Sequence, residues 1–593
     1  MNIKKKAEEL LGIKFGFEIK EISHDGVYVS FRNGCATVGG NTVPSLTRAY
    51  MLLAKGISEG KKELEISQKA SFDECGVMID VSFGCPLKVD SIKKYLDYMA
   101  FFGMNLMMLY TEDMYEVEGY PHFGYMRGRY SVKELSEVDS YAAELGIEVV
   151  PCMQTFGHLG KFLRYSAHGN IAENGSVLLP GEEETYKFLD ACIATCRKAF
   201  RSKRIHIGCD ETRGLGLGTT FSRDGARNRA EIFDIFNKHL LRVTEICKKY
   251  DFHPMMWSDM YFAIESPLSG TFGTDVTVPQ YAIDAMPDAD MVFWDYYHDD
   301  NDFYRINIEA HKKFNRKCIF AGGIWLWNGY APNFRYTYET VKPALEECLR
   351  GDVKSVLGTA WAYGDINHMQ GLFCLAMYSE YCWRGLDCTR EDINSVGEFV
   401  TKTPFELTEA ISDFFCGLIG DFNVGKLVLF SDPLINLLCY DYDLPAYEKC
   451  FENSLEVFEK YPDAPYIDYY KALFTATLSK VRLQQNLRKK YKENDRDWLR
   501  NFAEVTVPRM ASEFRELYEL QDKLWHTDQK TFAFEKVANN YAAAIFRIEY
   551  AGRQVSAYLN GEITEIEALE QEPLQGEKQQ FLSVERVMNT LSI

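Results

Sequence analysis

Long apolar runs are missing from this chain of 593 residues. Even the longest, such as residues 104–110, fall far short of the roughly 20 apolar residues that a membrane-spanning helix needs. The first nine residues are basic and then acidic, so they lack the apolar core of a secretory signal. We therefore expect no membrane as a partner.

Paired cysteine motifs are missing too. The sixteen cysteines are scattered, with no CxxC pair and no regular framework of spacings. Reduced thiols in a cytoplasmic protein are the simplest interpretation of this pattern.

Positive charge is in short supply. The chain has 66 Lys and Arg against 86 Asp and Glu, a net charge of −20, and no local basic patch. Such a surface repels polyanions, so nucleic acid is not an expected partner. The 46% hydrophobic and 14% aromatic residues exclude a disordered chain.

From residue 76 onward, short apolar runs typical of β-strands alternate with amphipathic helical patterns. This alternation is typical of a parallel sheet built from β-α units, and eight such units predict an α/β fold of the (β/α)₈ TIM barrel type. The expected strands are 76–81, 105–110, 147–152, 204–208, 254–257, 291–294, 318–321 and 355–360, and the expected helices are 91–102, 132–145, 184–200, 226–249 and 340–350.

Two smaller regions flank this barrel. The pattern before it predicts one or two strands, including 26–31, and a helix at 45–56. After about residue 386 strand signals nearly vanish, and long helical patterns such as 466–491 and 508–524 follow. The predicted domains are a small N-terminal α+β domain at 1–70, the catalytic barrel at 71–385 and a C-terminal all-helical domain at 386–593.

The ends of the predicted strands carry acids and tryptophans. The chemistry of such barrels sits at the carboxyl ends of the strands, so these residues are expected to surround one site. They are Asp80, Thr111-Glu112-Asp113, QTFGH at 154–158, Asp210-Glu211, Trp257-Ser258-Asp259, Trp294-Asp295-Tyr296, Trp325-Leu326-Trp327, and Trp361 followed by Asp365 and His368.

Tryptophan is rare in the chain, yet five of its 8 tryptophans fall at these strand ends. Indole faces stack on the apolar face of a pyranose ring, and acids accept hydrogen bonds from sugar hydroxyls. A single tryptophan there could simply plug the core. Five on one rim favour a carbohydrate site.

The segment HIGCDE at 206–211 places two adjacent acids, Asp210 and Glu211, directly after a predicted strand. Repulsion between them is expected to raise one pKa and to leave a proton donor near neutrality. That suits glycoside hydrolysis, but sequence neighbours cannot easily flank a sugar as the two acids of an ordinary retaining glycosidase do. One acid would protonate the glycosidic oxygen while the other orients a substrate group that itself attacks.

These residues resemble a known family. HIGCDE is similar to the HIGGDE-type signature of family 20 β-N-acetylhexosaminidases, and QTFGH, WSD at 257–259, WDY at 294–296 and GTAW at 358–361 follow in the family's order. The QTFGH, HIGCDE and WDY patterns resemble the hexosaminidase D branch. The resemblance covers roughly residues 71–385.

The resemblance implies substrate-assisted hydrolysis with retention, in which the 2-acetamido oxygen attacks the anomeric carbon and forms an oxazolinium intermediate. It implies that Glu211 is the general acid and later the base, that Asp210 orients the acetamido N–H, and that Tyr296 hydrogen-bonds the acetamido oxygen. It implies removal of one terminal sugar, β-linked GlcNAc or GalNAc, from a small molecule or oligosaccharide. The substrate-binding residues expected on this basis are His158, Trp257, Trp294, Asp295, Trp327, Trp361 and Asp365.

The chain departs from the family pattern in two places. Many members have an arginine after the first barrel strand that clamps two ring hydroxyls, where this chain reads Asp80-Val81-Ser82-Phe83-Gly84. Gln154 stands where an Asp is common. The first departure leaves the preference between GlcNAc and GalNAc open, and tolerance of both is our hypothesis.

Two other functions compete with this one. A metal-dependent isomerase or hydrolase would use His158, His206, Asp210 and Glu211 as ligands, although His206 is better interpreted as a buried histidine of the barrel core. A non-catalytic sugar-binding protein is the other alternative. We expect neither metal nor other cofactor. The helical domain could cap the barrel or form a homodimer interface.

Overall fold

The structure of the chain is a computed structural model, which describes residues 2–225, 228–263, 272–327, 329–363, 365–415, 424–436 and 443–572. The chain forms two compact units. The first holds residues up to 324 together with 337–361 and 371–401, and the second holds 325–336, 362–370 and the chain from 402 onward.

A small sheet opens the first unit. Its strands lie in the order β1-β3-β2-β4, with β1 and β3 parallel and β2 antiparallel to both β3 and β4. Thr42 and Ser45 cap the amino end of helix α2 reciprocally, which fixes where that helix begins. The elements are α1 Ile3–Leu11, β1 Ile19–Ile22, β2 Val27–Arg32, β3 Cys35–Gly39, α2 Val43–Ser58 and β4 Leu64–Gln68.

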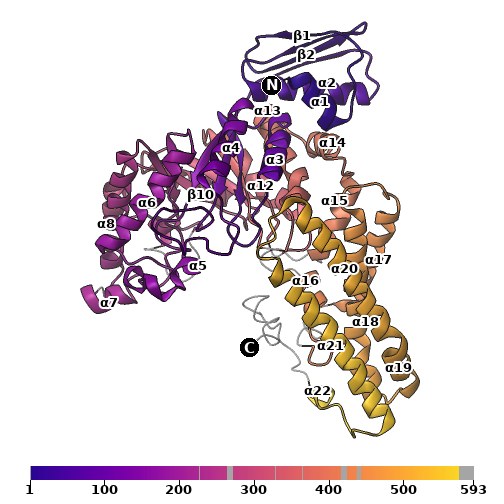
Figure 1. The fold of residues 1–593 in the computed structure, drawn as a ribbon. Coiled ribbons are helices and arrows are strands. Elements are labelled where there is room, and N and C mark those ends of the chain that lie inside the picture. The colour runs from indigo at the N-terminus through magenta and orange to yellow at the C-terminus, as the bar shows by residue number, and fades with distance from the viewer. Residues whose placement is uncertain are drawn as a thin grey trace. The chain divides into compact units, whose positions relative to one another are not determined.

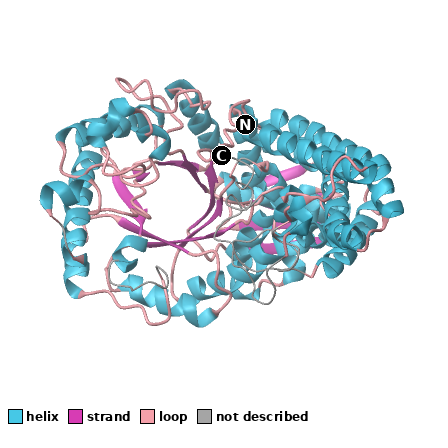
Figure 2. Cartoon of the chain, turned by 90° about the horizontal axis from the view of Figure 1, so that it is seen from below, coloured by secondary structure: helices cyan, strands magenta, loops and turns pink. Residues whose placement is uncertain are grey.

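Eight parallel strands then close into a barrel, in the order β10-β11-β12-β5-β6-β7-β8-β9. Figure 2 shows these strands as a ring inside a layer of helices. The predicted TIM barrel is therefore confirmed. The strands are β5 Glu74–Asp80, β6 Leu106–Tyr110, β7 Glu148–Cys152, β8 Arg204–His206, β9 His253–Trp257, β10 Asp290–Trp294, β11 Cys318–Gly323 and β12 Ser355–Ala360.

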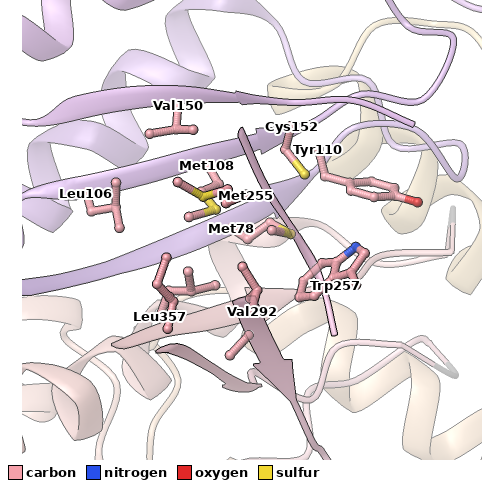
Figure 3. Close-up of a cluster of buried hydrophobic side chains, with 12 residues drawn as sticks. Met78, Leu106, Met108, Tyr110, Val150, Cys152, Met255, Trp257, Val292 and Leu357 are labelled. Atoms are coloured by element: carbon pink, nitrogen blue, oxygen red, sulfur yellow. The ribbon is translucent and has the colours of Figure 1, made fainter. Parts of the chain in front are cut away.

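The barrel interior is a packed apolar cluster (Figure 3). Strands of a parallel sheet are covered on both faces, so they read as continuous apolar runs, and β6 is buried at each of its five positions. In Figure 3, Tyr110, Cys152 and Trp257 lie toward one end of the cluster and Leu106 toward the other. The first three are the last residues of their strands, so the core ends where the site begins.

The helices of the first unit surround this barrel (Figure 1). The Ser131 hydroxyl accepts the Glu134 N–H at 3.2 Å, and the Glu134 carboxylate accepts the Ser131 N–H at 2.8 Å, so α4 starts with a capping box. Residues 226 and 227 of the helix expected at 226–249 lie outside the described residues. The helices are α3 Val89–Phe101, α4 Val132–Glu144, α5 Gly160–Leu163, α6 Glu183–Ala199, α7 Thr219–Asp224, α8 Arg229–Lys249, α9 Asp259–Ala263, α10 Gln280–Ala285, α11 Asn301–Lys312, α12 Phe334–Arg350, α13 Leu375–Arg384 and α14 Arg390–Thr401.

Within the residues that the structure describes, the regular elements of the second unit are all helices, as predicted. Pro508 lies in the first turn of α20, directly after a π-helical turn at Phe502–Thr506, and a proline that lacks the backbone N–H fits such an interruption of the regular hydrogen-bond pattern. Residues 573–593 of the predicted helical domain lie outside the described residues. The helices are α15 Phe405–Ser412, α16 Val424–Phe430, α17 Leu444–Glu459, α18 Ile467–Lys492, α19 Arg496–Asn501, α20 Val507–Asp528, α21 Phe534–Asn560 and α22 Glu567–Glu570.

The cysteines within the described ranges are all free thiols. Across those same ranges, no helix combines the length and the apolar character that crossing a bilayer requires. The predicted domain boundaries near 70 and 385, like the cytoplasmic location, stay predictions.

Candidate active site at the carboxyl ends of the strands

A tight turn follows β8 and carries both candidate acids. Gly208, Cys209 and Glu211 all have left-handed backbones, with φ of 71°, 72° and 42°. A Cβ on Gly208 would lie 2.0 Å from Gln154 Oε1, and that same oxygen accepts the Cys209 N–H at 3.3 Å. The glycine thus lets Gln154 pack against the turn, and the turn directs Asp210 and Glu211 from the barrel end.

Asp210 and Glu211 both lie close to the same ring nitrogen of His158. His158 Nε2 lies 3.0 Å from Asp210 Oδ2 and 3.7 Å from Glu211 Oε2. Gln154 Nε2 donates to the other oxygen of Asp210 at 2.8 Å. The Asp210 side chain is 15% exposed and that of Glu211 is 35% exposed. Asp210 is therefore recessed and held from two sides, whereas Glu211 is more open to a ligand.

His158 changes the electrostatics that the adjacent acids alone would give. Burial lowers the His158 pKa, but the charge and hydrogen bond of Asp210, with further charge from Glu112 and Glu211, raise it to about 10. Burial raises the Asp210 pKa, but His158 and Gln154 outweigh it and leave that pKa below its ordinary value. The repulsion expected from the sequence is thus reversed at Asp210, which is ionised beside a charged imidazole.

Asp259, the first residue of α9, is an acid of this cluster whose pKa is raised. Burial, followed by the charge of Asp210, raises the Asp259 pKa well above its ordinary value. Its Oδ2 accepts the Glu211 N–H at 3.0 Å. From the sequence we expect Asp259 at this rim, as part of the WSD motif, but without a role of its own, because its contact with Glu211 becomes visible only in the fold.

Aromatic side chains line the same end of the barrel. Trp361 lies edge-on to Tyr110 with ring centroids 4.8 Å apart, and Trp257 is 6.2 Å from Trp361. Trp294 stacks on Tyr296 at 5.3 Å. Burial raises the Tyr296 pKa, so its hydroxyl keeps its proton and can donate a hydrogen bond. The structure brings these four predicted residues to the rim that carries Asp210: Trp257, Trp294, Tyr296 and Trp361.

The carboxylate of Asp295 is hydrogen-bonded mainly to residues of the loop that follows it. Its Oδ1 accepts the N–H groups of Tyr297 and His298, both at 3.1 Å, and the Tyr304 hydroxyl at 3.0 Å. Its Oδ2 lies 2.9 Å from His298 Nδ1. These contacts shape the loop after β10, and the sugar-binding role expected of Asp295 stays a prediction.

Positive charge reaches the end of β5 from other elements, although no arginine follows that strand in the sequence. Lys161 of α5 donates to the Ser82 carbonyl at 3.1 Å, and Arg127 donates to the same oxygen. Lys161 Nζ also lies 4.5 Å from the centre of the Phe83 ring and 3.4 Å from Glu112 Oε2. The sequence reading missed Lys161 because only the fold brings it to that strand.

Trp327 and Asp365 belong to the second unit. There Trp327 stacks on Trp325, with ring centroids 3.9 Å apart. Asp365 Oδ2 pairs with Lys426 Nζ at 2.5 Å, and both side chains are largely buried. Their expected contributions to sugar binding stay predictions.

His206, one of the four ligands that the metal hypothesis names, is part of the barrel core. His206 is fully buried, its Nδ1 accepts the Gly208 N–H at 3.1 Å, and burial lowers its pKa to about 3. Over the described ranges, no three His, Cys, Asp or Glu side chains are arranged to hold a metal ion. His206 is thus a neutral core residue that supports the turn after β8.

Two segments of the chain match known families. Residues 72–278 match the glycosyl hydrolase family 20 catalytic domain, and residues 417–588 match the glycoside hydrolase 20C C-terminal domain. Both matches point to one family of glycoside hydrolases, and together they reach into both compact units.

Individual relatives agree with these matches. Hexosaminidase D of Homo sapiens is 28% identical over 303 residues, which are 49% of this chain and 57% of that protein. Hexosaminidase D of Bos taurus is 28% identical over 252 residues, 41% of this chain and 67% of that one. The chain thus spans little more than half the length of the human relative. A crystal structure of a beta-N-acetylhexosaminidase covers 65% of this chain and 91% of its own, with a TM-score of 0.51 at 15% identity, which supports the fold.

Proposed function

Because the chain belongs to glycoside hydrolase family 20, we propose that it is an exo-acting β-N-acetylhexosaminidase. It removes terminal β-linked GlcNAc or GalNAc by retaining, substrate-assisted hydrolysis. The observation that carries this proposal is the placement of Asp210 and Glu211 on one side of His158, with Asp210 ionised. Two acids on one side of the site suit a mechanism in which one acid orients the substrate and the other transfers the proton. They suit less well a mechanism in which two acids lie on opposite sides of the glycosidic bond.

In the first step the acetamido carbonyl oxygen bonds to the anomeric carbon while the glycosidic C–O bond breaks. Glu211 gives its proton to the departing oxygen. Asp210 accepts a hydrogen bond from the acetamido N–H, which gains positive charge as the oxazolinium ring forms. Tyr296, which keeps its proton, donates to the acetamido oxygen and holds it beneath the anomeric carbon.

In the second step water attacks the same anomeric carbon and opens the ring. Glu211, now ionised, takes a proton from that water, and the acetamido group returns to its starting form. Two displacements at one carbon retain its configuration. Trp257 and Trp361 supply apolar walls for the sugar and its N-acetyl group.

Hydrolysis of paired substrates tests this function. 4-Nitrophenyl β-GlcNAc should be cleaved at least about 10³-fold faster than 4-nitrophenyl β-glucoside, which lacks the attacking acetamido group. Comparable rates for the two glycosides would contradict substrate assistance. In a structure with an oxazoline-mimicking inhibitor, the ring nitrogen should face Asp210 and the acetamido-derived atoms should reach Tyr296.

The sugar preference has its own comparison. We propose that both GlcNAc and GalNAc are accepted, because the arginine that clamps ring hydroxyls in many members is absent after β5. The two 4-nitrophenyl glycosides should differ by less than about tenfold in kcat/KM. A preference of several hundredfold would contradict the proposal.

We further propose a cytoplasmic location, on the scattered cysteines, and a homodimer formed through the helical domain. Fractionation of cells that express the tagged chain tests the first. Sedimentation of the purified protein across a range of concentrations tests the second.

A further inference from the structure

Asp259 contacts the backbone of the proposed acid and not its carboxyl group. Asp259 is 2% exposed and begins α9, with Ser258 between it and the last residue of β9. Its Oδ2 accepts the Glu211 N–H at 3.0 Å. The proposed mechanism gives Asp259 no step, so the presence of this third, buried acid beside the more exposed Asp210 and Glu211 needs another explanation.

The residue that Asp259 holds has an unusual backbone. Glu211 has φ of 42°, in the left-handed region of backbone conformation that residues other than Gly, Asn and Asp rarely adopt. Such a conformation costs about 1–3 kcal/mol and persists only where neighbouring groups fix it. Cys209, earlier in the turn, is fixed by Gln154, which accepts its N–H, and by Thr155, whose hydroxyl lies 3.1 Å from its sulfur. Asp259 accepts the backbone N–H of Glu211 just as Gln154 accepts the backbone N–H of Cys209, so each fixes one left-handed residue of the turn.

The charge state of Asp259 matters because of what surrounds it. The titratable groups that act on it are Asp210 and Glu211, and it acts in turn on Cys209. A carboxylate there would add a third negative charge beside two acids. Burial and the charge of Asp210 raise its pKa well above the ordinary value, against hydrogen bonds from Glu211 and Trp294. Burial and the charge of Asp210 thus favour the uncharged form of the carboxyl group that accepts the Glu211 N–H.

We propose that Asp259 is a positioning residue, whose carboxyl group holds the strained backbone of Glu211 so that the Glu211 side chain can protonate the leaving group. This inference rests on the proposed function. It separates two tasks within one acidic cluster: Asp210 works as an ion, whereas Asp259 works as a hydrogen-bond acceptor for the backbone of Glu211.

The dependence of rate on the leaving group tests this role. Protonation is needed most for a poor leaving group such as the sugar of chitobiose, and least for 2,4-dinitrophenolate. In the full-length chain, Asp259→Ala should lower kcat/KM about 10²-fold on chitobiose but less than about tenfold on the 2,4-dinitrophenyl glycoside. Asp259→Asn, which keeps a neutral oxygen in place, should stay within about fivefold of wild type on both.

A matched control separates positioning from a general loss of structure. Asp139 of α4 is also a buried acid whose pKa is raised by burial, and it lies outside the site. Asp139→Ala should leave the ratio of the two rates unchanged. Equal losses on both substrates for Asp259→Ala, or a loss for Asp259→Asn as large as for Asp259→Ala, would overturn the inference.

Hydrogen exchange gives a readout that does not depend on activity. The amides of residues 207–212 should exchange at least about tenfold faster in Asp259→Ala than in wild type or Asp259→Asn. Unchanged exchange would overturn the hold of Asp259 on Glu211 while leaving the glycosidase proposal standing. If wild type cleaved neither substrate, the proposed function and the protonation role would both fail, and faster exchange would then show only a structural contact.

Discussion

At the amino-terminal end of the barrel, opposite charges alternate. Arg204 lies between Glu74, at 2.8 Å, and Glu148, at 2.5 Å, and Lys317 pairs with Glu74 at 2.8 Å. Burial raises the Glu74 pKa, but Lys317, Ser355 and Arg204 outweigh it and leave that pKa below its ordinary value. At the carboxyl end acids crowd together instead, and the pKa values of Asp259 and Glu112 are raised, above all by burial.

Backbone strain follows the same division. Left-handed residues at the amino-terminal end include Asp251, Asn315 and Asp352, types that tolerate this conformation. At the carboxyl end the left-handed residues include Glu112, Cys209 and Glu211, types that do not. One end of the barrel is therefore built for stability and the other holds charge and strain that stability alone would not select.

A Glu→Gln substitution at each end of the barrel should give the clearest separation between catalysis at the carboxyl end and stability at the amino-terminal end. Glu211→Gln removes the proposed proton donor and should lower kcat about 10³-fold on chitobiose, with a free energy of unfolding within about 0.5 kcal/mol of wild type. Glu74→Gln should do the reverse, lowering the free energy of unfolding by about 2 kcal/mol with kcat within about twofold. Urea unfolding and steady-state kinetics on both variants measure the contrast, which is wrong if Glu74→Gln loses activity.

His158 should show the next largest effect. His158→Gln leaves Asp210 buried without its cation, so the Asp210 pKa should rise and kcat should fall about 10²-fold. The folded protein binds the His158 proton more tightly than the unfolded chain, since the pKa rises from 6.5 to about 10.

That shift fixes the pH dependence. The stabilisation by His158 is complete below about pH 6.5 and is lost as pH rises through about 10. The Asp210 pKa is lowered, so the same pair also weakens as pH falls through the folded pKa of Asp210. The difference in unfolding free energy between wild type and His158→Gln should therefore shrink from pH 7 to pH 10. A difference that stays constant over this range would show that the imidazole is neutral in the folded protein.

The smallest effect on activity is expected for the charge network at the amino-terminal end. Arg204→Met keeps much of the side chain's length and apolar stem but leaves Glu74 and Glu148 facing each other with less compensation. The free energy of unfolding should fall by about 2 kcal/mol, and kcat/KM should stay within about twofold. A loss of activity as large as that of His158→Gln would mean that the two ends are coupled.

The barrel was predictable because each strand is a continuous apolar run between helices, and every predicted strand lies within two residues of the observed limits. Asp210 and Glu211 were predictable for the same reason, since they follow such a run directly. The positive charge of His158 was not, because it depends on Glu112 and Asp210, which are distant in sequence. Nor was the role of Lys161, because only the closed barrel brings it to the end of β5.

Two residues of the site limit each other's evolution. Any side chain at position 208 would collide with Gln154, and any shorter residue at position 154 would lose the hydrogen bonds to Asp210 and Cys209. Substitution in either order thus passes through an impaired intermediate. Libraries that vary the two positions one at a time should return only the original pair, whereas simultaneous randomisation is the route by which a different turn after β8 could be found.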